Sequence, residues 1–453
     1  MSKEFLNGLL PYPRVAEKKD STFKIDSKTK VFVCDNAKKD YSYWLKKLGL
    51  NNVEKVENTS DGFVIFIGNA FEPESAESSF ESTQAYTISV SEKGITLFAK
   101  EEDGLSFAVK TLVKIFNLSE TIDCMFIDDA PMIKMRAIHM CLFNPNDGTE
   151  KDDTSPEVVK KRIELAAIMG YTHVFIEFWG MFPYKKHPYA CWPNSYYTAE
   201  KIEEIVSWCI NDLHITPCPA QNLTSHAGWS RIVTRQHVSL DQRPDLADMW
   251  IPGGWCFATE NPKTKQFLKD IIDDLLEAFH NPPMIHCGCD KAFGFGSTEE
   301  DRTKSADLLF AAHISNLNTY ITSKGVRPVM WADMIYTSMD SLTFRCNSNV
   351  ADMLPKNILM NIWTHNDPGE YWNVIDFFQD KGFQTVYAPF MNKESIENMI
   401  KLCISKKSLG IVQTTWHKPE QAKPYFVYSA AMQWNNKAEY SENSVKEMIS
   451  NVN

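Results

Sequence analysis

Beyond residue 130, short apolar runs alternate with longer segments whose apolar residues recur at helical spacing. The runs have the length of β-strands, and the longer segments have the pattern of amphipathic helices. The expected strands are residues 135–143, 173–179, 214–221, 284–290, 327–334, 358–364, 383–390 and 409–416. The expected helices are residues 156–169, 199–213, 262–279, 301–323, 370–381 and 393–405. Apolar strands that alternate with helices form parallel sheets, and this α/β repeat predicts a TIM (β/α)8 barrel.

A small α+β domain is expected before the barrel. Residues 23–25, 30–33 and 62–68 are typical of strands, and residues 85–90 and 94–99 of a hairpin. A helical pattern follows over residues 104–116, and the segment 127–131 interrupts the periodicity. We therefore expect an N-terminal α+β non-catalytic domain over residues 1–126 and the barrel over residues 127–438. Residues 439–453 are expected to form a C-terminal tail or helix.

The ends of the barrel strands are the places to look for chemistry. In this fold the active site lies at the C-terminal ends of the strands. Strand one also carries Arg136, near its start, and His139. The residues at or just after the other strand ends are Glu177, His226, Asp290, Lys291, Trp331, Asp333, Trp363, Tyr387, Trp416 and Lys418.

Tryptophan and carboxylate side chains dominate this set. Indole rings stack on the apolar faces of sugar rings, and carboxylates hold sugar hydroxyl groups. The composition therefore predicts a carbohydrate pocket, whereas the alternative is that the Trp residues only cap the barrel core. Two adjacent carboxylates after the fourth strand would indicate a glycoside-cleaving site. Here Asp290 is followed by Lys291.

Composition and net charge exclude several classes of binding partner. The net charge of −11 argues against nucleic acid, and no apolar run is long enough for a membrane span. Eleven Cys without a CxxC pair, and no signal peptide, indicate a reducing, cytoplasmic location. A signal peptide that had been removed would leave the same sequence. The His and Cys spacing indicates no metal cluster, so we expect neither a metal nor another cofactor.

Four motifs resemble glycoside hydrolase family 20, the β-N-acetylhexosaminidases, and are most similar to the hexosaminidase D type. Asp129-Ala130-Pro131 with Arg136 is similar to the start of the family's barrel. Glu177 with Met181-Phe182-Pro183-Tyr184 resembles the strand-two region. His286-x-Gly288-x-Asp290 resembles the family signature, and Trp331-x-Asp333-Met334 resembles strand five. The resemblance covers nearly the whole chain and implies a substrate that carries N-acetylhexosamine.

The resemblance also implies a mechanism in which the acetamide oxygen of the substrate attacks the anomeric carbon. Asp290 would stabilise the acetamide, and Arg136 would hold sugar hydroxyls. Glu177 and His226 resemble the acid–histidine pair behind the catalytic acid. Trp331, Trp363 and Trp416 would form walls around the acetamide and the sugar ring, with Asp333 beside them. Tyr387 would give the acetamide a second hydrogen bond.

Several positions depart from the family pattern. Lys291 occupies the place of the catalytic Glu, and Lys418 that of a second carboxylate that binds sugar hydroxyls. The Tyr-Glu-Asp run expected after Glu177 is Phe178-Trp179-Gly180. Three hypotheses follow: an active hexosaminidase-like glycosidase, with the two lysines favouring anionic sugars; a sugar-binding pseudoenzyme without hydrolysis; and a different reaction on the same barrel.

Overall fold

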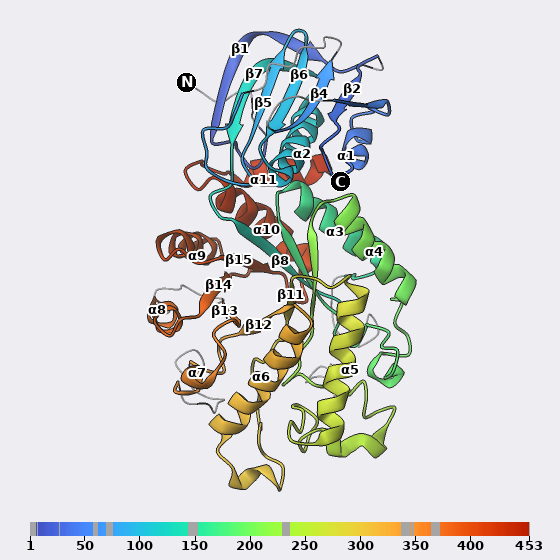
Figure 1. Ribbon diagram of the computed structural model, residues 1–453, viewed down its shortest axis with the longest axis vertical. Coiled ribbons are helices and arrows are strands. Elements are labelled where there is room, and N and C mark those ends of the chain that lie inside the picture. The colour runs from blue at the N-terminus through green and yellow to red at the C-terminus, as the bar shows by residue number, and fades with distance from the viewer. Residues whose placement is uncertain are drawn as a thin grey trace.

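A seven-stranded sheet and a closed parallel barrel follow one another along the chain (Figure 1). The computed structural model describes residues 6, 8–26, 28–57, 62–68, 76–143, 153–228, 236–336, 346, 348–363 and 372–452. The barrel closes in the order β10-β11-β12-β13-β14-β15-β8-β9. This arrangement confirms the predicted TIM barrel behind a small α+β domain.

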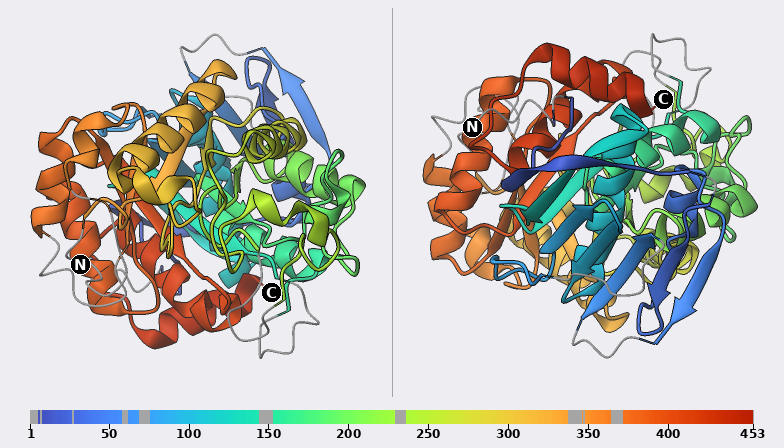
Figure 2. Two further views of the ribbon diagram at one scale, coloured as in Figure 1. Left: turned by 90° about the horizontal axis from the view of Figure 1, so that it is seen from below. Right: turned by 90° about the horizontal axis from the view of Figure 1, so that it is seen from above.

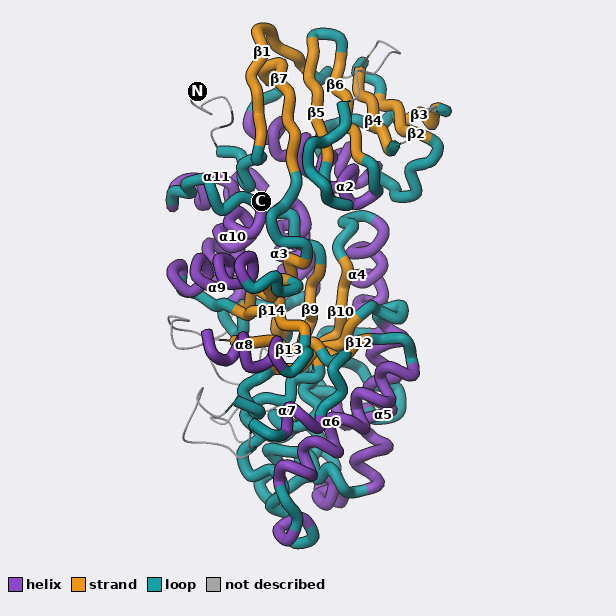
Figure 3. The backbone as a smooth tube through the Cα atoms, turned by 60° about the vertical axis from the view of Figure 1, so that its left-hand side comes forward, coloured by secondary structure: helices purple, strands orange, loops and turns teal. Residues whose placement is uncertain are grey.

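The first unit is a mixed sheet with one long helix on a face. Its strand order is β1-β7-β5-β6-β4-β2-β3. The strands are β1 Val15–Lys24, β2 Val31–Cys34, β3 Val53–Val56, β4 Phe63–Gly68, β5 Tyr86–Ser91, β6 Gly94–Ala99 and β7 Thr121–Asp129, and the helices are α1 Ser42–Lys46 and α2 Glu102–Leu118. Helix α2 lies between the sheet and the barrel (Figure 3).

Sequence patterning missed most of the two edge strands of this sheet. Nearly every side chain of β1 is exposed, and the same holds for the middle of β3. Such strands carry no alternation of apolar and polar residues, which is the signal that identifies a half-buried strand. Strand β7 was also missed, and it continues to Asp129, so residues 127–129 belong to the sheet rather than to a break.

The barrel strands pair in parallel throughout, and helices surround them (Figure 2). The strands are β8 Met135–Cys141, β9 His173–Glu177, β10 Thr216–Ala220, β11 Met284–His286, β12 Arg327–Trp331, β13 Leu359–Trp363, β14 Gln384–Ala388 and β15 Gly410–Thr414. The helices are α3 Pro156–Ile168, α4 Ala199–Asn211, α5 Pro262–Ala278, α6 Ala306–Ser323, α7 Val350–Met353, α8 Trp372–Asp380, α9 Lys393–Ser405, α10 Pro419–Trp434 and α11 Glu442–Val452.

Local sequence signals begin several of these helices. Pro occupies the first turn of α3, α5 and α10, where its missing N–H costs no hydrogen bond. The side chain of Asn261 accepts a hydrogen bond from the Lys263 amide at the start of α5, and Asn392 accepts one from the Ser395 amide at the start of α9. These caps fix where each helix leaves its preceding loop.

Element ends differ from the sequence prediction in a few places. The expected strand 284–290 ends at His286, and the expected helix 301–323 begins as α6 at Ala306, after a short 3-10 turn over Asp301–Thr303. Residue 364, at the end of an expected strand, and residues 370 and 371, at the start of an expected helix, lie outside the described residues. Within the described chain, no helix combines the length and the apolar character that a bilayer crossing requires.

The side chains inside the barrel change from apolar to polar and aromatic along its axis. An apolar layer near the strand starts contains Met135, Ala137, Phe175, Cys218, Ala220, Met284, Val329, Leu359, Val386 and Val412. Side chains two positions further along a strand point to the same face. The next inward positions are therefore His139 on β8, Glu177 on β9, His286 on β11 and Trp331 on β12, all buried. The sequence thus places polar and aromatic groups inside the C-terminal end of the barrel.

The first unit covers the opposite end of the barrel, where the strands begin. A cavity of about 610 Å³ there is lined by Phe107 of α2 and by Met135, His173 and Met284 from the strand starts. Helix α10, which carries few exposed residues and was not predicted, packs against β8, and its Trp434 donates a hydrogen bond of 2.9 Å to Asp129. Helices α10 and α11 lie beside α2 in Figure 1. Because the first unit occupies the end of the barrel where the strands begin, the functional site is expected at the other end, where the strands end.

Candidate active site

The chain bends sharply after β11 and so positions Asp290 and Lys291. Gly288, Cys289 and Lys291 have φ of +65°, +72° and +46°, in the left-handed region. A Cβ atom on Gly288 would lie 1.9 Å from Asn222 Oδ1, so this position requires glycine. The bend carries residues 290 and 291 between the loops that follow β10 and β12.

Asp290 is buried and has two cationic or potentially cationic neighbours. Its Oδ2 atom lies 2.8 Å from Lys291 Nζ and 3.3 Å from His226 Nε2. Its Oδ1 atom is buried and has no hydrogen-bond partner among the described residues. One carboxylate oxygen is therefore held in an ion pair, while the other remains an unused acceptor.

The two charges stabilise one another. Burial acts to raise the pKa of Asp290, but Lys291 and His226 outweigh it and hold the pKa well below its usual range. Burial acts to lower the pKa of Lys291, but the carboxylates of Asp290 and Asp333 outweigh it and raise the pKa. At neutral pH both groups are charged.

Asp333 forms the next layer of the site. It accepts a hydrogen bond of 3.2 Å from Trp363 Nε1 through Oδ1, and one of 3.2 Å from the Lys291 amide through Oδ2. Burial, followed by the charge of Asp290, raises the pKa of Asp333. The Lys291 ammonium group also lies 4.5 Å from the centre of the Trp363 ring, a cation–π distance.

Aromatic rings surround these charges. The ring centres of Trp331 and Trp416 lie 5.5 Å apart, and Trp331 packs on His286 with ring centres 4.3 Å apart. On the other side, Trp255 packs on His226 at 4.5 Å and donates a hydrogen bond of 2.7 Å to the Lys291 carbonyl. The sequence prediction did not include Trp255, because it belongs to the long segment between β10 and α5 rather than to a strand end.

Glu177 has different partners from those expected. The resemblance paired it with His226, but its Oε2 atom lies 2.9 Å from His139 Nε2, and its Oε1 atom accepts a 2.7 Å hydrogen bond from Asn222. His226 instead contacts Asp290. The expected pair is thus wrong, because His139 on the neighbouring strand β8 points inward beside Glu177 and the His226 loop reaches the fourth strand.

Arg136 and Tyr387 do not point into the site. Both flank inward-facing residues of their strands, so their side chains point outward. Arg136 lies at the start of β8, fully buried, and donates hydrogen bonds to Gly170 and Ile133 carbonyls and to Gln84. The Tyr387 hydroxyl is bonded to Ser408, outside the barrel wall. The expected roles of Arg136 with sugar hydroxyls and of Tyr387 with the acetamide are therefore wrong.

The structure places most of the other candidate residues in two neighbouring groups. Asp290, Lys291, His226, Asp333 and Trp363 form one connected group, and Trp331 and Trp416 form the ring pair beside it. Lys418 directly precedes α10, is half-buried, and forms no ion pair with another described residue.

Protein-family models match both units of the chain. The model of glycosyl hydrolase family 20, domain 2, matches residues 7–130, and that of the family's catalytic domain matches residues 178–444. Solved structures with the same fold include a β-N-acetylhexosaminidase from Bacteroides fragilis, with 17% identity, a TM-score of 0.68, and coverage of 94% of this chain and 90% of that one.

Two further structures are similar over nearly the whole chain. One is an exo β-N-acetylglucosaminidase from Vibrio harveyi in complex with N-acetylglucosamine, at 15% identity and a TM-score of 0.70, covering 97% of this chain and 76% of that one. The other is a Streptomyces plicatus N-acetyl-β-hexosaminidase, at 14% identity and a TM-score of 0.68, covering 98% and 94%. The catalytic-domain model alone matches more than half of this chain. The chain therefore belongs to glycoside hydrolase family 20.

Proposed function

We propose that this member of the family cleaves terminal N-acetylhexosamine from glycans by a substrate-assisted mechanism that retains the anomeric configuration. One observation carries the proposal: Asp290 is a buried, charged carboxylate whose Oδ1 atom has no hydrogen-bond partner among the described residues. A buried acceptor without a donor is costly. An acetamide N–H of the substrate is a donor of the right kind to satisfy it.

The chemistry then needs no carboxylate nucleophile. The acetamide oxygen attacks the anomeric carbon as the bond to the leaving oxygen breaks, and positive charge spreads over the acetamide. The negative charge of Asp290 stabilises that charge as it develops. This attack closes a second ring through the acetamide oxygen. Water later attacks the same carbon, the bond to the acetamide oxygen breaks, and the water gives up a proton. Because each attack inverts the anomeric carbon, the configuration is retained overall. Trp331 and Trp416 provide the apolar surface for the sugar ring and the acetamide methyl group.

Lys291 limits which leaving groups can depart. A general acid needs a pKa near the working pH, and the raised pKa of Lys291 makes its ammonium group a poor proton donor. Leaving groups that are stable as anions need no such donor. The ammonium groups of Lys291 and Lys418 would in addition favour sugars that carry a sulfate or carboxylate group, because those groups have the opposite charge.

A sugar-binding protein without hydrolysis is the second candidate. It is favoured by the 2.8 Å ion pair between Lys291 and Asp290, which neutralises part of the charge that would stabilise the intermediate. In this case the aromatic rings and Asp290 would hold N-acetylhexosamine, and the bond to the leaving oxygen would stay intact.

Turnover of an aryl β-N-acetylglucosaminide separates the two candidates. Purified protein is given a nitrophenyl substrate, whose leaving group departs without a proton, and binding of N-acetylglucosamine is measured by calorimetry. The proposal predicts turnover that is lost in Asp290→Ala and kept in Lys19→Ala, an exposed residue of β1 in the first unit. Sugar binding without any turnover would instead establish the binding protein.

A further inference from the structure

The ammonium group of Lys291 is the reachable charge of the candidate site. Its side chain is 34% exposed, whereas that of Asp290 is only 4% exposed. An ammonium group has three N–H donors, and here one of them is bonded to Asp290 Oδ2 at 2.8 Å. The group also lies 4.5 Å from the centre of the Trp363 ring. An anion that enters the pocket can therefore accept a further hydrogen bond from Lys291 without breaking the ion pair with Asp290.

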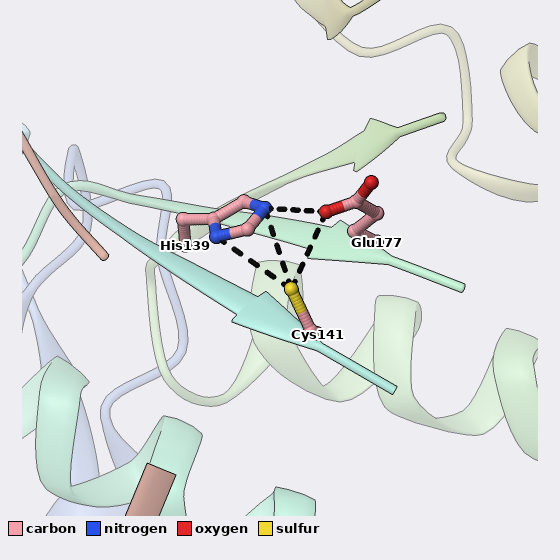
Figure 4. A group of neighbouring side chains, drawn as sticks. All are labelled: His139, Cys141 and Glu177. Carbon is pink, nitrogen blue, oxygen red and sulfur yellow. Dashed lines mark hydrogen bonds and ion pairs between the residues drawn. The ribbon is translucent and has the colours of Figure 1, made fainter. Parts of the chain in front are cut away.

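The carboxylates near Lys291 are engaged with other groups. Burial, followed by the charge of Asp290, raises the pKa of Asp333 and so favours its neutral form. Glu177 is bonded to His139 at 2.9 Å inside the barrel (Figure 4). In the reaction Asp290 faces the positive charge that develops on the acetamide of the substrate. The charge of Lys291 is then available to face a negative charge that develops elsewhere on the substrate.

A substrate that is bound through Asp290 brings its leaving group close to this ammonium group. An acetamide N–H that donates to Asp290 Oδ1 places its nitrogen about 2.9 Å from that oxygen. The anomeric carbon follows two bonds of about 1.5 Å later, so it lies within about 5–6 Å of Oδ1. Lys291 Nζ is beside the other oxygen of the same carboxylate. A leaving group that carries charge one or two bonds beyond the anomeric oxygen can therefore contact Lys291.

We propose, on the basis of the function proposed above, that the substrate is an N-acetylhexosamine whose anomeric oxygen belongs to a phosphodiester, and that Lys291 binds the departing phosphate. A phosphodiester that loses its sugar leaves as a phosphate monoester, whose second pKa is about 6. This dianion is stable at neutral pH without receiving a proton. An alcohol as leaving group would need a proton, which the raised pKa of Lys291 makes it a poor donor of.

The reaction balances with water as the only second reactant. The acetamide oxygen forms a bond to the anomeric carbon while the bond from that carbon to the phosphate oxygen breaks, and its electron pair leaves with the phosphate. Water then attacks the anomeric carbon, the bond to the acetamide oxygen breaks, and one proton passes to the solvent. The products are the free sugar and a phosphate monoester, and every bond to phosphorus stays intact.

The proposal also fixes the anomer of the substrate. The acetamide oxygen reaches the anomeric carbon only from the face opposite the leaving group. In N-acetylglucosamine the acetamide lies trans to a β-linked leaving group, so the β-anomer of the phosphodiester is the substrate. The α-anomer carries the same charge and the same leaving group but cannot react in this way, which makes it a matched control.

Hydrolysis of a synthetic phosphodiester by the full-length protein tests the proposal. The compounds are methyl N-acetyl-β-glucosaminyl phosphate, its α-anomer and a nitrophenyl β-N-acetylglucosaminide. The proposal predicts release of methyl phosphate from the β-anomer alone. In water enriched in the heavy oxygen isotope, the methyl phosphate should contain no label, because the bond to the sugar carbon breaks. Labelled methyl phosphate would overturn the proposal.

The nitrophenyl glycoside separates this proposal from the function on which it rests. Hydrolysis of the nitrophenyl glycoside without hydrolysis of the β-phosphodiester would overturn the phosphodiester substrate and leave the proposed function intact. A protein that hydrolyses neither compound would contradict both proposals.

Lys291→Met isolates the contribution of the charge, because methionine is of similar length and uncharged. For the β-phosphodiester, kcat/KM should fall about 10²-fold, the effect of removing one group that stabilises developing charge. It should fall less for the nitrophenyl glycoside, whose leaving group spreads its charge over a ring. Lys291→Arg should restore most of the difference between the two substrates. Lys19→Met, on the exposed strand β1, is the control and should change neither rate.

A merely structural role of Lys291 would lower the two rates by the same factor. Equal losses for the two substrates in Lys291→Met would therefore overturn the proposal. If this variant does not fold, the comparison of the three compounds with the wild-type protein decides.

Discussion

Lys291 Nζ lies 2.8 Å from Asp290 Oδ2, so the residue that we propose stabilises the substrate forms an ion pair with the residue that follows it. The pairing fixes the protonation of both groups. It leaves Asp290 Oδ1 as the one buried carboxylate oxygen of this residue without a partner among the described residues. The carboxylate and the ammonium group of this pair therefore have separate effects on catalysis, which variants of each residue can measure.

Asp290→Asn should remove catalysis while keeping the shape of the side chain. The amide cannot supply the negative charge that stabilises the developing acetamide cation, and loss of such a group typically costs about 10²–10³-fold in kcat. Steady-state kinetics with a nitrophenyl β-N-acetylglucosaminide would measure the change. A variant with wild-type kcat would remove Asp290 from the mechanism.

Lys291→Glu should introduce a proton donor. Hydrolysis of substrates with poor leaving groups should rise by about 10²–10⁴-fold, the usual contribution of a general acid. The matched control is Lys19→Glu, the same charge reversal on an exposed strand of the first unit, which should leave the rate unchanged. If Lys291→Glu hydrolyses substrates with poor leaving groups no faster than the wild type does, the departures around Glu177 and Lys418, and not Lys291 alone, limit hydrolysis.

The pH dependence should differ between these two proteins. In the wild type the pKa of Asp290 is lowered and that of Lys291 is raised, so neither group changes charge between about pH 5 and 9. Neither should therefore produce a limb in the pH–rate profile over that range. Lys291→Glu should acquire a loss of rate on the alkaline side, because a catalytic acid must be protonated. The same profile for both proteins would show that residue 291 transfers no proton.

Gly288→Ala should destabilise the protein through the bend that carries Asp290. A left-handed backbone with a Cβ costs about 1–2 kcal/mol, and here the Cβ would also meet Asn222. Gly325→Ala is the control, since Gly325 has φ of +77° and nothing within 4 Å of the added atom. Urea denaturation should show a larger loss for Gly288→Ala, by at least about 1 kcal/mol for the added clash. Equal losses would mean that the contact with Asn222 relaxes freely.

Arg136→Met should affect stability rather than substrate binding. The guanidinium group donates hydrogen bonds to Gly170, Ile133 and Gln84 at the closed end of the barrel, and bonds from a charged donor are each worth about 1.5–3 kcal/mol. A lower free energy of unfolding with an unchanged KM is expected. A raised KM with unchanged stability would return Arg136 to the pocket.

Much of the candidate site could be predicted from the sequence, because the ends of parallel barrel strands can be recognised there. Apolar runs marked the strands, and the rule that chemistry follows their C-terminal ends brought Asp290, Asp333 and Trp363 into one group before any contact was known. The same alternation along a strand would have excluded Arg136 and Tyr387, because each flanks an inward-facing residue. Their expected roles rested on the resemblance alone, which does not fix whether a side chain points into or out of the barrel.

Other features carry no signal in a single sequence. Trp255 reaches the Lys291 carbonyl from a long loop, and no periodicity predicts where a loop folds back. The hydrogen-bonded contact of His139 and Cys141 with Glu177 requires two strands to be aligned so that Cys141 pairs with Glu177 (Figure 4). Neither the spacing of His139 and Cys141 nor the position of Glu177 indicates this contact until that register is known.

The dependence of the rate on the leaving group tests the central claim most directly. A series of aryl β-N-acetylglucosaminides with leaving phenols of rising pKa would be hydrolysed by the wild type and by Lys291→Glu. Without a proton donor at residue 291, the wild-type kcat/KM should fall steeply across the series, whereas that of Lys291→Glu should fall only slightly. A shallow dependence in the wild type would show that a proton is delivered to the leaving oxygen, and it would contradict the account of Lys291 given above.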